Sequence, residues 1–205
     1  MATIGYGYLA PADHFANAIV TIESFFGIIL TALITGVFFA RFSTPRARVL
    51  FSKVAVIADF DGKRTLQFRL ANERSTAIVE ATVHVYLTRN EKLAHGETMR
   101  RVYDLELRRN TTPVFALSML AQHTIDEKSP LYGVTPDALT ASATNIVVTF
   151  TGIDDLLAAT VHSRYLYSAS DIRFEHRFID LFRTDESGRT YMDFEPFHET
   201  HPLIQ

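Results

Sequence analysis

FANAIVTIESFFGIILTALITGVFFARF, residues 15–42, is the stretch that decides the fold of this chain. Before Arg41 it is apolar except for a few small polar residues and the single charge of Glu23. As a helix, its roughly 28 residues would be ~42 Å long. The hydrocarbon core of a bilayer is ~30 Å thick, so the stretch predicts a tilted membrane-spanning helix. It lacks the pattern of a signal peptide, because no basic region precedes it and no small-residue cleavage site closes it.

The charges that flank this helix predict its orientation. Asp13 and His14 precede it, whereas a basic cluster follows it, consisting of Arg41, Arg46, Arg48 and Lys53. Because basic residues collect on the cytoplasmic side of membrane helices, we expect the rest of the chain to be cytoplasmic.

A stripe of mostly small or polar residues recurs every four positions along the helix, at Glu23, Gly27, Thr31, Thr35 and Phe39. One interpretation is small-residue packing between membrane helices. The interpretation that we favour is a pore-facing stripe with a bend at Gly27 and a hydrophobic constriction at Phe39. Glu23 is a functional candidate because acids inside membranes are costly, although it could simply pack against a neighbouring segment.

After Pro45, which ends the helix, the hydrophobic period changes to two. One predicted strand places Val79, Ala81, Val83, Val85 and Leu87 on an apolar face and Glu80, Thr82, His84 and Tyr86 on a polar face. Asp61-Gly62 and Ser187-Gly188 are turn signals, and Thr135-Pro136-Asp137 is typical of a helix start. Further strands are predicted at 65–70, 102–108, 114–120, 146–150, 161–167, 172–182 and 190–194. Many short strands at this spacing favour an antiparallel sandwich of immunoglobulin type.

On the other side of the helix the chain begins with Thr3-Ile4-Gly5-Tyr6-Gly7. Alternate glycines permit backbone angles that turn successive carbonyls in one direction, which could replace the hydration shell of an ion. The pentapeptide resembles the TVGYG filter of potassium channels. The alternatives are a Gly/Tyr-rich terminal loop and a phosphate-binding loop; no Gly-Lys-Ser/Thr follows, which argues against the latter.

The composition argues against several other classes of function. The net charge of -3 gives no reason to expect a nucleic-acid partner, and the absence of cysteine excludes disulfides and cysteine-based zinc sites. The eight histidines show no metal-ligand spacing, and Asp59-Phe60-Asp61-Gly62 lacks the later ligands of a calcium loop. No nucleophile stands in a recognisable setting, so we expect neither an enzyme, a bound metal nor a cofactor.

Segments from both ends of the chain together resemble the inward-rectifier potassium channels, in particular their bacterial branch. The resemblance rests on 3–7, Phe38–Phe42 with Pro45, Phe51–Lys63, Leu70–Arg74, Ile78–Ala81, His123–Gly133 and Asp171–Phe182. It implies a tetramer with a potassium filter at Thr3, Ile4, Gly5, Tyr6 and Gly7, K⁺ being the permeant ion. It further implies a cytoplasmic pore at Glu80, a loop from Gly152 to Thr160 that narrows this pore, and a bracing residue at Arg164.

The resemblance also implies properties of conduction. Thr31 stands where strongly rectifying members carry an acid, and Arg108, Thr112 and Thr151 replace other acids, which implies weak rectification. Arg41, Arg46 and Arg48 fall where the family binds phosphoinositide headgroups, although basic residues also fit plain topology. Family members have an outer helix, an amphipathic helix and a pore helix before the filter. This sequence has none of them, so we expect a fragment that does not conduct by itself.

The sequence therefore predicts three parts. They are a filter and outer mouth (1–14), an inner transmembrane helix (15–44), and a cytoplasmic immunoglobulin-like β-sandwich (45–205). The expected function is that of a subunit of a potassium channel in the cell's inner (plasma) membrane. The alternative is a membrane-tethered sandwich that binds a partner.

Overall fold

The computed structural model describes residues 7, 11–42 and 47–203. The chain forms two compact units, residues 1–45 and 46–205.

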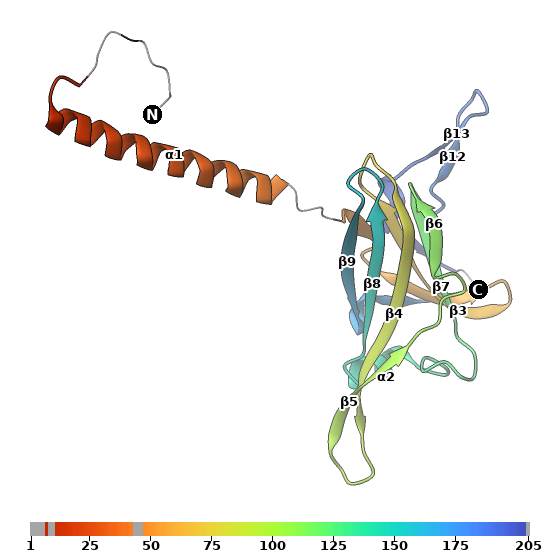
Figure 1. The fold of residues 1–205 in the computed structure, drawn as a ribbon. Helices are drawn as coiled ribbons and strands as arrows, with labels where there is room; N and C mark the ends of the chain where they lie inside the picture. Colours follow the sequence, from red (N-terminus) through yellow and green to blue (C-terminus); the bar gives the residue numbers. More distant parts are fainter. Residues whose placement is uncertain (1–6, 8–10, 43–46, 204–205) are drawn as a thin grey trace. The chain divides into compact units, whose positions relative to one another are not determined.

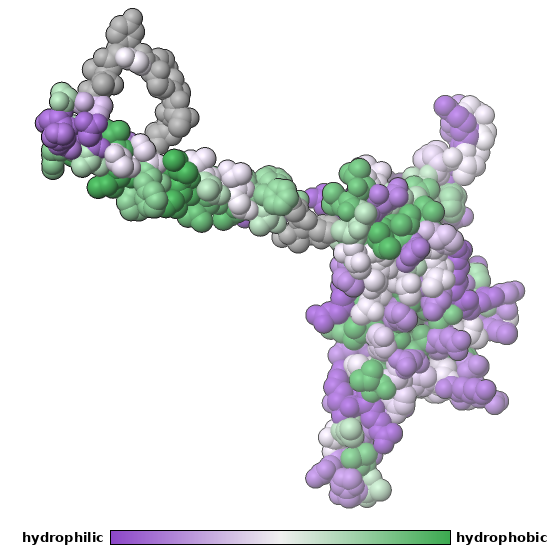
Figure 2. Space-filling view, in the orientation of Figure 1, coloured by the Kyte–Doolittle hydropathy of each residue, from purple (hydrophilic) through white to green (hydrophobic). Residues whose placement is uncertain are grey.

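The first unit contains one long helix, α1 (His14–Phe42). Asp13 begins it, because its Oδ1 accepts a hydrogen bond from the Ala16 amide at 2.7 Å and so satisfies one of the free N–H groups of the first turn. Most of the face of α1 that Figure 2 shows is apolar, and none of the helix residues is buried. The helix is long and apolar enough to cross a membrane, as the sequence predicts.

The second unit is a sandwich of two sheets (Figure 1). Sheet A contains β1 (Val49–Phe51), β2 (Ala55–Phe60), β3 (Lys63–Asn72), β7 (Ser118–Thr124) and β10 (Ile172–Phe174). Sheet B contains β4 (Ile78–Lys92), β5 (Thr98–Asp104), β6 (Thr111–Phe115), β8 (Asn145–Asp154) and β9 (Ala159–Ser168). Two small ladders join β11 (His176–Phe178) to β14 (Thr200–Pro202) and β12 (Phe182–Thr184) to β13 (Thr190–Met192). Three short helices complete the unit: α2 (Pro136–Ala141), η1 (Ala169–Asp171) and η2 (Glu195–His198).

The inner faces of the two sheets share one hydrophobic core. Phe68 of sheet A and Phe150 of sheet B are almost completely buried in it, and Tyr167 packs against Phe68 with ring centres 5.7 Å apart. The Tyr167 hydroxyl lies 3.2 Å from Ser52 Oγ. This buried hydroxyl is therefore paired, as the cost of burying a lone polar group requires.

The structure confirms two predictions that depend on adjacent residues alone, a tight turn and a helix start. Asp61 and Gly62 both have positive φ, 52° and 70°, as the two-residue turn between β2 and β3 requires. Thr135 caps α2 by accepting a hydrogen bond from the Ala138 amide. The expected purely antiparallel pairing has one exception, because β10 runs parallel to β2.

Three of the predicted strands are wrong because the chain crosses between the sheets within them. The predicted strand 102–108 ends as β5 at Asp104, after which Leu105 bonds to Val85 in sheet B and Leu107 bridges to His123 in sheet A. The predicted strand 114–120 divides into β6, paired with β4, and β7, paired with β3. The predicted strand 172–182 divides into β10, β11 and β12, with a break at Glu175, whose φ is 53°.

Candidate functional site

The four-residue stripe predicted on the membrane helix lies within α1. Gly27, Thr31, Thr35 and Phe39 are all helical, and the Thr31 hydroxyl donates a 2.8 Å hydrogen bond to the Gly27 carbonyl. This bond satisfies the Thr31 hydroxyl inside an apolar helix without a second chain. The Phe39 ring is 74% exposed, and Glu23 is exposed as well.

The predicted filter and the basic cluster are only partly described. Thr3, Ile4, Gly5 and Tyr6 lie outside the described residues, and Gly7 has a φ of 74°, a conformation that favours glycine. Arg41 stands in the last turn of α1, and Arg48 is exposed just before β1. Arg46 lies outside the described residues.

Glu80 occupies an irregularity in strand β4. Its φ is 51°, and the register of β4 against β8 shifts between Val79 and Thr82. This β-bulge alters the predicted alternation, because Ile78 rather than Val79 joins Ala81 in the core. The Glu80 side chain is exposed, on the strand that carries Thr82 and His84 away from the core. A non-glycine residue held in this conformation is characteristic of functional sites.

Gly152 of β8 lies directly against this bulge. A Cβ at Gly152 would stand 2.4 Å from Ile78 Cγ2, 3.3 Å from the Val79 carbonyl oxygen and 3.4 Å from Ala81 Cα. Only glycine allows β4 and β8 to approach so closely at this point. The structure thus brings together two of the residues that the sequence predicts for the cytoplasmic pore.

The turn that follows Gly152 is held by a buried acid, Asp154. Its Oδ1 accepts hydrogen bonds from the amides of Leu156 and Leu157, both at 3.0 Å. Its Oδ2 pairs with Arg74 Nη2 at 2.6 Å, and the Asp154 side chain has no exposed surface. The tip of the turn carries Leu156 and Leu157, which are 73% and 49% exposed. The predicted loop from Gly152 to Thr160 is therefore a β8–β9 hairpin with an apolar tip and a charged brace.

The outer face of sheet B carries polar side chains in ladder register. Thr82, Thr151 and His162 form one row, in which Thr151 Oγ1 lies 3.2 Å from His162 Nδ1. His84 and Arg164 flank Thr149 in the next row, and both are exposed. Arg164 is therefore on the same face of the sheet as His84, two residues beyond His162 on the hairpin's second strand.

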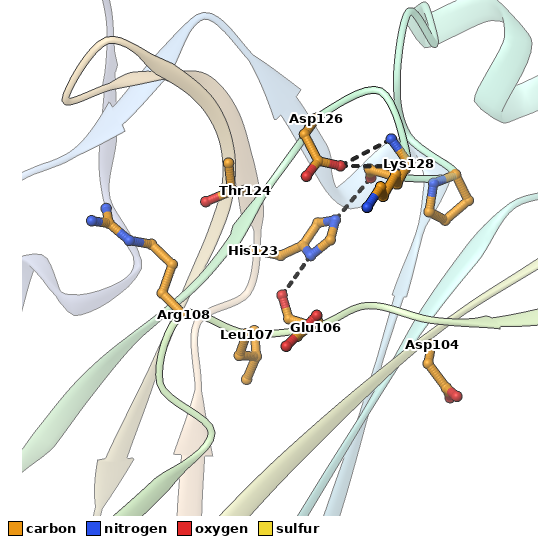
Figure 3. A pocket seen from close by; sticks show the side chains of 10 residues that line it. Asp104, Glu106, Leu107, Arg108, His123, Thr124, Asp126 and Lys128 are labelled. Atoms are coloured by element: carbon orange, nitrogen blue, oxygen red, sulfur yellow. Dashed lines mark hydrogen bonds between the residues drawn. The ribbon is translucent and has the colours of Figure 1, made fainter.

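A separate pocket of about 380 Å³ opens between β7 and the segment around Glu106 (Figure 3). At its base His123 is buried, with Nδ1 2.7 Å from the Glu106 carbonyl and Nε2 2.8 Å from Ser129 Oγ. Burial lowers the pKa of His123, although the Glu106 carbonyl and nearby acids oppose this shift. The pocket wall carries charges of both signs: Asp104, Glu106, Arg108, Asp126 and Lys128.

Sequence reasoning missed the bulge, the Arg74–Asp154 pair and the Thr151–His162 contact. The sequence contains no signal for the bulge, because Glu80 fits the polar face of a regularly alternating strand. Asp154 gave none, because a polar residue near Gly152 is equally typical of a solvated loop. Among the described residues, no group of three His, Asp or Glu side chains is arranged to hold a metal ion.

A single apolar helix followed by a β-sandwich with an exposed polar sheet face defines a class of membrane-anchored protein with a folded extramembrane domain. The family model of the inward rectifier potassium channel C-terminal domain matches residues 49–204, so the chain belongs to the inward rectifier potassium channel family.

Named relatives support this membership along nearly the whole chain. The inward rectifier potassium channel Kirbac3.1 of Paramagnetospirillum magnetotacticum is 44% identical over 199 residues, covering 97% of this chain and 68% of the relative. Human inward rectifier potassium channel 4 is 32% identical over 214 residues, which cover 98% of this chain and 47% of the relative. The bovine G protein-activated inward rectifier potassium channel 1 is 31% identical over 208 residues, which cover 97% of this chain and 41% of the relative. The chain thus spans about two thirds of the bacterial relative and less than half of the mammalian ones.

Proposed function

We propose that this chain is a subunit of a homotetrameric channel that conducts K⁺ passively across the cell's inner (plasma) membrane. The carbonyls of Thr3 to Gly7 form the filter, and Gly27, Thr31, Thr35 and Phe39 face the pore. The bacterial relative, whose name describes an inward rectifier potassium channel, supports this function. No cofactor is required, because the ion moves down its own gradient.

The observation that carries the cytoplasmic half of the proposal is the outer face of sheet B. Glu80 stands exposed at the bulge, and polar side chains continue from it along β4, β8 and β9. Rings of such side chains, one from each of four copies, would give an aqueous path whose acids attract cations. The apolar tip at Leu156 and Leu157 would narrow this path, and Asp154 and Arg74 would hold the tip in position.

Two finer properties belong to the same proposal. Rectification is weak, because Thr31, Thr112 and Thr151 are uncharged and Arg108 is positive, so none of these positions supplies a negative charge that would attract a cationic blocker. Anionic lipid modulates the channel through Arg41, Arg46 and Arg48, which stand in the sequence at the end of the membrane helix and just after it, where basic residues attract anionic headgroups. The sandwich is cytoplasmic, in agreement with the basic residues that follow α1.

The absence of cysteine from the chain allows a clean test of the central axis. A Glu80→Cys variant in detergent, treated with a short bis-maleimide, should yield a covalent dimer in high yield, because each linker joins two of the four Glu80 positions that face one axis. The matched control is Arg177→Cys, on β11, which covers the opposite sheet of the sandwich and has its own exposed side chain. This control should give far less crosslinking.

Mass photometry of the same samples measures assembly without crosslinking. A population of four-fold particles supports the proposal. An exclusively monomeric chain, with equal crosslinking at the two cysteines, would instead favour a membrane-tethered sandwich that binds a partner.

A further inference from the structure

Three side chains with hydrogen-bond donors are neighbours on the outer face of sheet A, whereas Glu80 and Gly152 belong to sheet B. Gln67 and Arg69 are two residues apart on β3 and therefore share a face, while Leu66, Phe68 and Leu70 point into the core. Gln122 of β7 is the direct cross-strand partner of Gln67. Side chains opposite each other in an antiparallel ladder have Cβ atoms about 5 Å apart, as Gln67 and Gln122 do. Arg69 is the diagonal neighbour of Gln122, and diagonal neighbours about 7–8 Å apart are still within reach of long side chains.

The C-terminal part of the chain covers this face. The Arg69 guanidinium lies 4.6 Å from the centre of the Phe178 ring, and its Nη2 donates a hydrogen bond to the Ile179 carbonyl. As a result Gln67 is 6% exposed and Arg69 is 9% exposed. Arg69 thus lies between sheet A and the segment around β11, Gln67 is buried beside it, and Gln122 is partly exposed.

One nitrogen of each side chain is buried without an acceptor among the described residues: Gln67 Nε2, Arg69 Nη1 and Gln122 Nε2. A buried donor without a partner costs about 1–3 kcal/mol, and more when it is charged. Three such donors at one place are unusual for a native structure, where buried polar groups are nearly always satisfied. All three lack the same kind of partner, namely an acceptor.

The positive charge of Arg69 also indicates that an acceptor is missing from this place. Arg69 forms no ion pair with a carboxylate of the described residues, and burial lowers its pKa to about 10, a shift that the charge of Asp180 opposes. A buried guanidinium that forms no ion pair is costly. A negative partner would satisfy both the charge and the hydrogen bonds.

We propose that Gln67, Arg69 and Gln122 bind a small inorganic anion between sheet A and the segment Phe178–Ile179. The ligand class is a halide or a small oxyanion, because such an ion accepts several hydrogen bonds and donates none. A single water molecule does not match this site, since its oxygen has two acceptor positions for three donors and carries no countercharge. The bound ion would fasten the C-terminal segment to the sheet.

The test is thermal unfolding of the full chain in detergent, followed by circular dichroism at constant K⁺ and constant ionic strength. Potassium gluconate is the reference, because its anion is too large for the layer, and chloride, bromide or phosphate replaces it stepwise. A specific site predicts a saturable rise in the unfolding temperature of about 3–6 °C at ten times the dissociation constant. Comparison of the chloride and bromide series with the phosphate series shows whether the site prefers a halide or an oxyanion.

Gln122→Glu tests the same site from within, since it places a carboxylate beside Arg69. This variant should unfold in chloride and in gluconate at the same temperature, because the side chain now supplies the countercharge. Arg177→Gln removes an exposed arginine of the covering segment and should keep the wild-type anion response. Crystals grown in bromide should show an anomalous peak between Gln67, Arg69 and Gln122.

Two outcomes overturn the inference. One is a wild-type unfolding temperature that does not distinguish chloride, bromide and phosphate from gluconate. The other is an anion response that Gln122→Glu retains in full, with no bromide peak at the three side chains. Both are independent of whether the chain assembles as a channel.

Discussion

Gly152 shows how strictly one residue can fix the approach of two strands. An added Cβ would meet Ile78 Cγ2, which belongs to a fully buried β-branched side chain and has little freedom to move. We expect Gly152→Ala to lower the free energy of unfolding by about 1–3 kcal/mol, as overpacking does in other cores. Urea titration of the full chain measures this. In an Ile78→Ala background, which removes the obstructing methyl group, the same substitution should cost much less; equal costs would contradict the close approach.

Asp154 combines two roles that a matched substitution separates. Asp154→Asn keeps an oxygen acceptor for the amides of Leu156 and Leu157 but removes the charge that Arg74 faces at 2.6 Å. Breaking a buried ion pair from one side typically costs about 3–5 kcal/mol, so we expect a loss of about 3 kcal/mol in unfolding free energy. Asp155→Asn, at the adjacent exposed position, should change stability by less than about 0.5 kcal/mol. Similar losses in both variants would contradict the bracing role.

His123 makes stability depend on pH in a direction that follows from its burial. Its pKa is lowered below the ordinary value of 6.5, mainly by burial, so the unfolded chain binds a proton more readily than the folded one. The neutral ring therefore contributes stability above about pH 6.5 that is lost as the pH falls below that value. Unfolding midpoints should decrease between pH 7 and pH 5.

Two histidine substitutions locate the origin of this decrease. His123→Gln, which can still donate to the Glu106 carbonyl and accept from Ser129, should flatten the pH dependence. His95→Gln, on the exposed β4–β5 hairpin, should leave it unchanged. His198 also has a pKa lowered by burial and by Lys53, so the unfolding midpoint of the His123→Gln variant should still depend weakly on pH. A His123→Gln profile parallel to that of the wild type would contradict the assignment.

At the scale of elements, the sequence predicts those parts of the fold whose signal is local. The apolar run of α1, the Asp61-Gly62 turn and the Thr135 cap are each specified by neighbouring residues, and each is confirmed. The crossings at Leu105–Leu107 and after Phe115 are not local. Their side chains keep an apolar pattern while the backbone changes partners from one sheet to the other, so periodicity alone reads them as continuous strands.

The same distinction applies to the candidate site. The polarity of Glu80 and His84 is visible in the alternation of β4, but the bulge at Glu80 depends on Gly152, about 70 positions later in the chain. The Arg74–Asp154 pair likewise joins two turns that are distant in sequence. Long-range pairs of this kind require the register of β4 against β8, which no single strand specifies.

The end of α1 and the start of the sandwich give a prediction about lipid. Arg41 and Arg48 are exposed, and each basic residue near an anionic membrane surface contributes about 1 kcal/mol, or about fivefold in affinity. Arg41→Gln with Arg48→Gln should weaken binding of a short-chain phosphoinositide to the solubilised chain by about 30-fold, measured by native mass spectrometry. Arg177→Gln, which removes one exposed arginine elsewhere, should leave binding unchanged. An equal loss in this control would indicate a general charge effect instead of a headgroup site.

At the scale of the whole molecule, four-fold assembly would multiply each pore-facing side chain by four. Thr31, whose hydroxyl is occupied by the Gly27 carbonyl, adds no charge to the proposed cavity. Thr31→Glu would add a ring of four carboxylates there, and such rings attract cations strongly in a low-dielectric pore. We therefore expect the half-blocking concentration of spermine from the cytoplasmic side to fall at least tenfold. Single-channel recording measures this in a fusion that places an outer helix and a pore helix ahead of Thr3.

Thr31→Gln is the matched control, because it has nearly the same size as Thr31→Glu without the charge. It should leave block by spermine close to that of the unsubstituted fusion. If the two variants behave alike, Thr31 does not face a shared cavity and the stripe from Gly27 to Phe39 serves helix packing.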